Sequence, residues 1–273
     1  MLTKETILIY AIPFFFLLIA IEAIVAGKEY RQQKLKRDFF TSFIIGAGFL
    51  IASAFAKSTI IFCFVFLNRY GLFNLPANKW WVWLLCFICD DFTYYWFHRI
   101  SHRVRFLWAS HVVHHSSEIY SYSSALRQGW TGSVTGAFLF WAWMPLLGFN
   151  AVMVIFIKSL SIIYQYWTHT ELVKKMPPWF EFVFNTPSHH RVHHGSNKKY
   201  IDKNYGGIFI IWDRLFRSFI AEDEQPHYGI ASKTPSQNIL QIVFFEWNNI
   251  VNQLIKENRI KQFLRIILNL NFF

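Results

Sequence analysis

The fold is decided at residues 80–102, which read WWVWLLCFICDDFTYYWFHRISH. An aromatic and apolar run from Trp80 to Phe97 is followed at once by His98 and His102. On a helix, residues four apart lie on one face, so both imidazoles can reach one metal ion. We therefore predict a membrane-spanning helix that delivers metal ligands to the surface of the bilayer.

Three further apolar runs flank this stretch. Ile7 to Ala26 is about long enough to cross a bilayer, and Phe39 to Leu67 is either one tilted span or a span with an interfacial turn. The run from Val134 to Trp167 is too long for one span and contains Pro145 and Gly148, which favours two short helices in a hairpin. The sequence thus predicts an all-α, polytopic integral membrane protein.

Composition supports this class. Apolar residues make up 54% and aromatic residues 20% of the 273 residues, whereas only 16% are charged, which excludes a disordered chain. All three cysteines lie in apolar runs, and we interpret the CxxC pair Cys86 and Cys89 as packing residues. The net charge of +11 comes from basic residues that flank the spans, so we expect contact with lipid and no nucleic-acid partner.

Loop charges predict the orientation. The loop after the first run is rich in basic residues, whereas the next loop carries only Arg69 and Lys79, so the first of these loops is expected in the cytoplasm. Counting spans onward places residues 98–130 and 169–273 on that side, as a histidine-rich cytoplasmic di-metal cap on a bacterial inner membrane or the endoplasmic reticulum. The basic residues of the first loop are Lys28, Arg31, Lys34, Lys36 and Arg37.

The chain divides into three expected parts. Residues 1–79 would form the N-terminal transmembrane spans, and residues 80–232 the catalytic domain. Residues 233–273 would form amphipathic helices at the membrane interface, because lysines and arginines interleave the apolar residues after Asn238.

Nine histidines form the candidate metal site. Spacings of three and four residues put neighbouring imidazoles on one helical face. Two histidine triplets have this spacing, at residues 111, 114 and 115 and at residues 190, 193 and 194, and they invite two metal ions. One buried imidazole alone is more often satisfied by a carbonyl, but so many together without a ligand would cost about 1 to 3 kcal/mol each. The nine are His98, His102, His111, His114, His115, His169, His190, His193 and His194.

Other polar residues have secondary expectations. Asp91 lies on the helical face of His98, and we take it as the candidate catalytic carboxylate that orients the imidazoles. His189 falls outside the triplet spacing, and His227 is expected in a solvated loop. Weaker candidates for the role of Asp91 are Glu118, Asn185 and Asp213.

These residues resemble a known family. HRISH at 98–102, HVVHH at 111–115 and HRVHH at 190–194 are similar to the histidine boxes of the fatty acid hydroxylase and sterol desaturase superfamily. Within it, the flanking stretches DFTYYWFHR at 91–99, NTPSHHRVHHG at 185–195 and IDKNYGGIFIIWD at 201–213 most resemble the alkylglycerol monooxygenases, over about Trp80 to Gly229.

The resemblance implies two iron ions that activate O2 and oxidise a carbon of a membrane lipid. In the ether-cleaving relatives this carbon is the methylene beside the ether oxygen, so that a fatty aldehyde is released, and tetrahydrobiopterin donates electrons. No residue here can be assigned to the electron donor from the sequence. Arg103 stands where relatives often carry a glutamate, and Arg217-Ser218 replaces a frequent Gly-Thr.

Three alternatives stay open. A sterol or fatty-acyl hydroxylase or desaturase would use the same boxes, and only its products would distinguish it. A membrane metal transporter would place histidines within its spans, whereas these boxes follow span ends. A zinc hydrolase would need an open coordination position and a carboxylate base, and the boxes contain no such base.

Overall fold

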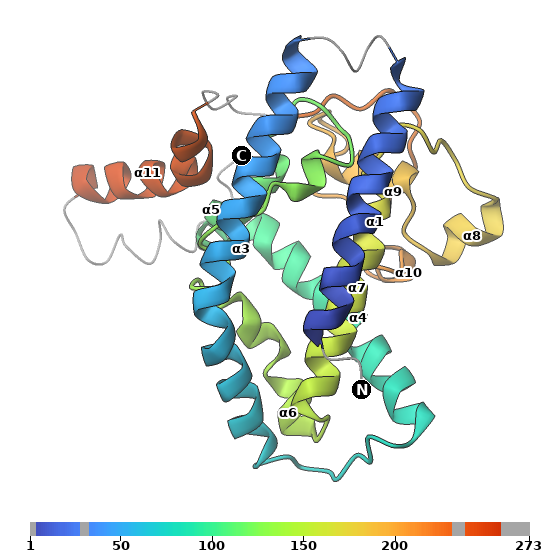
Figure 1. Ribbon diagram of the computed structural model, residues 1–273, viewed down its shortest axis with the longest axis vertical. Coiled ribbons are helices and arrows are strands. Elements are labelled where there is room, and N and C mark those ends of the chain that lie inside the picture. The colour runs from blue at the N-terminus through green and yellow to red at the C-terminus, as the bar shows by residue number, and fades with distance from the viewer. Residues whose placement is uncertain (1–3, 28–32, 231–237, 258–273) are drawn as a thin grey trace.

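The computed structural model describes residues 4–27, 33–230 and 238–257. Every regular element in these residues is a helix, apart from one isolated bridge between Phe184 and Phe209. Long helices form an elongated bundle, with short helices beside it and α6 (Trp143–Leu147) near its lower end (Figure 1). The predicted all-α class is confirmed.

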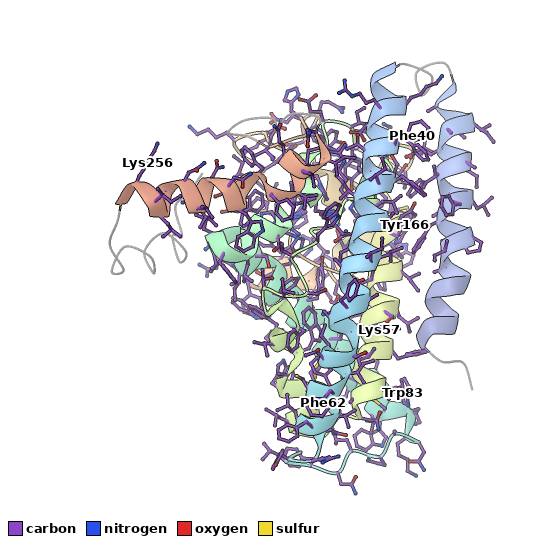
Figure 2. The ribbon with its side chains drawn as sticks, turned by 60° about the vertical axis from the view of Figure 1, so that its left-hand side comes forward. Phe40, Lys57, Phe62, Trp83, Tyr166 and Lys256 are labelled. Atoms are coloured by element: carbon purple, nitrogen blue, oxygen red, sulfur yellow. The ribbon has the colours of Figure 1, made fainter. Side chains whose placement is uncertain are left out.

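Helices α1 (Lys4–Val25) and α3 (Gln33–Asn68) run antiparallel (Figures 1 and 2). The second long apolar run is one unbroken helix without an interfacial turn. Within the described residues, Lys36–Asn68 is the helix long and apolar enough to cross a membrane, with a mean hydropathy of 2.1 over its best window. Only 6% of that window is buried, so its apolar side chains point outward.

Helices α4 (Trp80–Arg103) and α7 (Ala151–Trp167) pack together around the main apolar core. The chain reaches α7 through α6 (Trp143–Leu147) and breaks at Gly148, whose φ is +120°, a conformation that favours glycine. Asn150 then caps α7, because its side chain accepts two backbone N–H bonds. The predicted break near Gly148 is confirmed. Cys86 packs in this core, and all three cysteines are free thiols.

Short helices and turns lie between and beyond these long helices. They are α5 (Arg105–His111), the 3-10 turns η1 (His114–Ser116), η2 (Ser124–Leu126) and η3 (Ala137–Trp141), α8 (Pro178–Val183), α9 (Pro187–His194) and α10 (Ile211–Leu215). Three of them, α5, η1 and α9, carry histidines.

Helix α11 (Ile239–Glu257) is the described part of the predicted amphipathic tail, and it lies across the direction of α3 (Figure 2). Ile242 and Ile250 are buried, whereas Leu240 and Ile255 are exposed. The later apolar residues of the tail, 258–273, lie outside the described residues, as do Lys28 and Arg31 of the basic loop.

Candidate metal centre

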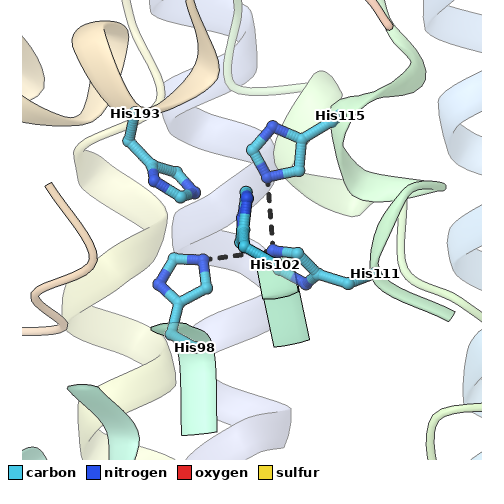
Figure 3. A group of neighbouring side chains, drawn as sticks. All are labelled: His98, His102, His111, His115 and His193. Atoms are coloured by element: carbon cyan, nitrogen blue, oxygen red, sulfur yellow. Dashed lines mark hydrogen bonds between the residues drawn. The ribbon is translucent and has the colours of Figure 1, made fainter. Parts of the chain in front are cut away.

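The nine predicted histidines lie together in two groups, in each of which the ligand atoms are within 4.8 Å of one another. The first group takes imidazoles from α4, α5, η1 and α9 (Figure 3). The second takes them from η1, α9 and the chain after α7. The first group is His98, His102, His111, His115 and His193, and the second is His114, His169, His190 and His194.

The two groups divide each histidine triplet. His114 and His115 are adjacent in sequence but belong to different groups, as do His193 and His194. Adjacent helical residues point about 100° apart, whereas residues four apart share a face. The geometry thus divides the nine histidines into two groups, and each triplet contributes to both groups.

The first group has the spacing of ligands around one ion. The Nε2 atom of His111 lies 3.1 Å from Nε2 of His98 and 3.2 Å from Nε2 of His115. Two nitrogen ligands at right angles, each about 2.1 Å from a metal, lie about 3.0 Å apart. The buried Nε2 atoms of His102 and His193 have no hydrogen-bond partner among the described residues. The donors present therefore fit a metal ion.

The second group has a hydrogen-bond arrangement that favours a cation. His114 donates through Nδ1 to the carbonyl of Arg127 at 3.1 Å, and His169 donates through Nδ1 to the carbonyl of Gln165 at 3.0 Å. A neutral imidazole carries one N–H, so both Nε2 atoms present lone pairs. These Nε2 atoms nevertheless lie 3.2 Å apart. Two facing lone pairs repel unless a cation lies between them.

Burial keeps the imidazoles neutral. Desolvation lowers the pKa of His114 to about 4, and it lowers the pKa of His169, His193 and His194 well below the ordinary value of 6.5. The other imidazoles of the cluster lower the pKa of these three further. Neutral imidazoles are the form that binds metal, so the cluster is ready for cations at neutral pH.

A loop at residues 205–209 holds the His98 ring through its Nδ1 atom. The carbonyl of Tyr205 accepts the Nδ1–H of His98 at 2.9 Å, and the ring of Tyr205 contacts His98, His102 and His193. The next two residues are glycines, and a Cβ on Gly207 would lie 2.9 Å from Oδ1 of Asp91. Only glycine fits this close approach.

Three polar residues singled out from the sequence hold this loop. Asp91 accepts the backbone N–H of Ile208 and Phe209, at 2.7 and 3.1 Å, and the indole N–H of Trp212 at 2.9 Å. Asp213 accepts the N–H of the loop residues 205 and 206, at 2.8 and 2.6 Å. Asn185 donates to the carbonyl of residue 206 at 2.7 Å.

The expected mode of action of Asp91 therefore needs correction. Its hydrogen bonds in the described residues go to the loop and to Trp212, and none goes to an imidazole. The helical face was correct, but the loop lies between this carboxylate and His98. Asp91 is placed to position a ligand through the loop.

Buried anchors near the N-terminal helices were missed. Glu22 of α1 accepts the Tyr122 N–H at 2.8 Å and the Thr170 hydroxyl at 2.7 Å, directly beside His169. Asp38 of α3 pairs with the guanidinium of Arg127, whose carbonyl holds His114. A lone acid in an apolar run, as Glu22 is, could have indicated such an anchor.

The remaining candidates lie outside both groups. His189, which falls outside the triplet spacing, is buried, 2% exposed, and its Nε2 lies 4.0 Å from Oε2 of Glu181. His227 is exposed, as predicted, and Glu118 is exposed as well. Arg217 has a φ of +59°, which explains why glycine is frequent there, and the Ser218 hydroxyl bonds to Asp213 at 2.7 Å.

Comparison with known proteins agrees with this geometry. Residues 83–218 match the fatty acid hydroxylase family, and this stretch contains all nine clustered histidines. The chain belongs to the fatty acid hydroxylase family through this domain. No solved structure matches the chain.

Its curated relatives include alkylglycerol monooxygenases. The chain is 41% identical over 225 residues to the enzyme of Homo sapiens, covering 81% of this chain and 49% of that protein. It is 39% identical over 236 residues to the enzyme of Danio rerio, covering 86% and 52%. The ornithine lipid hydroxylase OlsE of Rhizobium tropici is 26% identical over 136 residues, covering 50% and 41%. The chain spans about half the length of the alkylglycerol monooxygenases it matches.

Proposed function

We propose that this fatty acid hydroxylase family member is a membrane-bound lipid monooxygenase whose two histidine groups each bind one iron ion. The observation that carries the proposal is the pair of facing Nε2 lone pairs on His114 and His169. Imidazole suits iron as well as zinc and copper, and the family resemblance favours iron.

Two bound irons would activate dioxygen, and the chain would hold and shield them. The carbonyls of residues 127, 165, 203 and 205 orient four imidazoles through Nδ1, which leaves each Nε2 for metal. Trp108, Tyr120 and Tyr205 pack against the imidazoles and exclude water from the cluster. Together these contacts preorganise the ligands before a metal binds.

The proposed substrate is an alkylglycerol ether. One oxygen atom of O2 is inserted into a C–H bond of the methylene beside the ether oxygen, and the other leaves as water after uptake of two electrons and two protons. The hemiacetal then breaks into a fatty aldehyde and a glycerol. Support comes from the two alkylglycerol monooxygenases at 39% and 41% identity. Tetrahydrobiopterin is the proposed electron donor, by the family resemblance.

Hydroxylation without cleavage is the second candidate. The match to an ornithine lipid hydroxylase supports it, although at 26% identity over half of this chain. A sterol or fatty-acyl substrate would give a stable alcohol or an alkene, whereas an ether substrate gives an aldehyde.

We also propose a multi-pass topology with the histidine cluster on the cytoplasmic side. The outward apolar face of α3 supports a membrane location, and residues 80–232 would form the catalytic domain between the N-terminal spans and the interfacial tail. His98 and His102 lie in the last turns of α4, and His169 follows α7. The cluster would therefore lie at the surface of the bilayer, within reach of lipids in the adjacent leaflet.

The activity test uses membranes that contain the iron-loaded protein, an alkylglycerol and tetrahydrobiopterin. We expect oxygen consumption coupled to aldehyde release in the wild type, and neither in His193→Ala. His227→Ala is the matched control and should be fully active, because this imidazole is exposed and lies outside both groups.

The products decide between the candidates. Oxygen consumption with no aldehyde, but with an alcohol formed from a sterol or acyl lipid, would replace ether cleavage by hydroxylation. An iron-loaded protein that consumes no oxygen with any of these lipids would contradict the monooxygenase proposal.

A further inference from the structure

A cavity of about 430 Å3 lies between α8, α9 and α10, and none of the nine clustered imidazoles lines it. It is therefore separate from the candidate metal centre. Residues that line it include Lys175, Glu181, Ser188, His189, Arg214 and Phe219.

The charges of this cavity favour an anionic ligand. Lys175 and Arg214 contribute two positive charges. Glu222 also lines the cavity, but the guanidinium of Arg191 donates to both of its oxygens at 2.7 Å and neutralises it. Glu181 accepts hydrogen bonds from the chain beside it through Oε1. Arg191 lies outside the lining but pairs with Glu222, so Lys175 and Arg214 face one unpaired carboxylate, Glu181, and the net charge is +1.

The wall of the cavity also holds an unsatisfied polar group. The His189 side chain lines the cavity and is 2% exposed, and its Nδ1 has no hydrogen-bond partner among the described residues. A buried polar atom without a partner costs about 1 to 3 kcal/mol. A bound polar molecule, or the water it orders, would reduce this cost.

An exposed apolar rim lies beside the cavity. Trp179 and Phe182 of α8 are 70% and 60% exposed, and Leu215 of α10 is 63% exposed. Arg214 joins the two helices, because its Nε donates to the carbonyl of Phe182 at 3.1 Å. Large apolar side chains exposed beside basic residues are typical of segments at the membrane interface.

The rim continues the outward face of α4. Trp212 of α10 contacts the ring of Phe92 at 5.1 Å, and Leu84 and Ile88 are exposed further back along α4. Helices α8 and α10 lie on the opposite side of the molecule from α11 (Figure 1). A bilayer around α4 would therefore reach this rim as well.

We propose that the cavity binds the phosphate headgroup of an anionic membrane phospholipid whose acyl chains lie against Trp179, Phe182 and Leu215. The pairing of a cationic cavity with an adjacent apolar rim matches the two parts of such a lipid. This site goes beyond the proposed oxidation, because it fixes α8 and α10 at the bilayer without contributing to the metal cluster.

The test measures photo-cross-linking of the protein to a photoactivatable phosphatidylglycerol in phosphatidylcholine nanodiscs. Lys175→Glu should weaken the apparent affinity roughly tenfold, because it replaces an attractive charge beside the bound phosphate with a repulsive one. The matched control is Lys174→Glu, which makes the same charge change on a side chain 78% exposed and outside the cavity lining. It should change the affinity by less than about twofold.

Each other outcome overturns the site. An equal loss in Lys174→Glu would show diffuse attraction to the membrane, and cross-links that map away from residues 175–222 would place the lipid elsewhere. Competition by inorganic phosphate at the same concentration would identify a free-anion site. His193→Ala, which removes a proposed iron ligand, should bind the lipid normally, so this proposal and the oxygenase proposal can fail independently.

Discussion

His114 and His169 face each other through Nε2 atoms 3.2 Å apart, while the Nδ1 of each donates to a backbone carbonyl. When both Nδ1–H groups donate to these carbonyls, neither neutral ring has an N–H left for the contact between the two Nε2 atoms. Protonation of either ring is opposed by burial. The protein has therefore arranged two lone pairs around a position that favours a metal ion.

The first prediction concerns the loop that Asp91 holds. Asp91→Asn replaces an acceptor of three N–H bonds with an amide that can place an N–H against a donor. We expect the loop to shift and the support of His98 to weaken, with a tenfold to hundredfold loss of metal affinity on the order seen for outer ligand partners. Competition with a chelator measures the affinity.

Asp223→Asn is the control for this variant. Asp223 is exposed and contacts Lys199 and Tyr200, which lie outside the loop, so the metal affinity of this variant should equal that of the wild type. Unchanged affinity in Asp91→Asn would show that the loop does not position His98.

The second prediction is a pH dependence of the metal-free protein. The unfolded chain protonates its histidines near pH 6.5, whereas the folded protein holds the pKa of His114 at about 4 and that of His169 well below 6.5. The stability that these groups contribute is present above about pH 6.5 and is lost as the pH falls toward about 4. Buried carboxyls contribute in the opposite sense, since burial raises the pKa of Asp213 to about 6 and also raises the pKa of Asp202, but the clustered imidazoles outnumber them.

Thermal unfolding of the chelator-stripped protein between about pH 7 and about pH 5 measures this effect. We expect the Tm to fall steadily across the interval, and His227→Ala to show the same slope. A Tm that stays constant would mean that the imidazoles can take up protons in the folded state.

The third prediction concerns Arg217. Its φ of +59° costs a non-glycine residue about 1 to 2 kcal/mol, and its side chain is exposed. Arg217→Gly should raise the Tm by about 2 to 4 °C. Lys198→Gly, at an exposed position with negative φ, should lower it. An equal decrease in both variants would indicate that the Arg217 side chain stabilises the turn.

The fourth prediction concerns the docking of α11 on α5. Arg105 pairs with Glu246 at 2.6 Å, and both side chains are buried. Glu246→Ala leaves a buried guanidinium without a carboxylate, with its hydrogen bond to Gln253 retained, and should cost about 3 to 5 kcal/mol. Helix α5 carries His111, so the loss should appear both as proteolysis after α5 and as weaker metal binding. Arg105→Met with Glu246→Leu should recover much of the stability, and a double variant no better than the single one would contradict this reading.

Sequence reasoning identified the long elements because their signals are local. Apolar length marks α3 and α4, and Gly148 marks a break that no distant contact is needed to explain. Eight of the nine clustered histidines lie three or four residues from another one, and this short-range pattern was visible in the sequence.

The division of the histidines into two groups could not be predicted in the same way. Whether His193 joins His98 or His169 depends on how α9 is rotated against α4, which contacts between distant segments decide. The hydrogen-bond partners of Asp91 were not predicted for the same reason, because they lie more than a hundred residues away in sequence. Glu22 and Asp38 were missed as anchors since their partners are loops without a pattern.

The most direct test of the central claim is the number of metal ions bound to each purified chain, measured by elemental mass spectrometry after iron loading. We predict about two per chain in the wild type and in His227→Ala, and about one in His169→Ala, which removes a ligand of the second group alone. A wild-type protein that binds one ion or none, or a His169→Ala variant that retains two, would contradict the account.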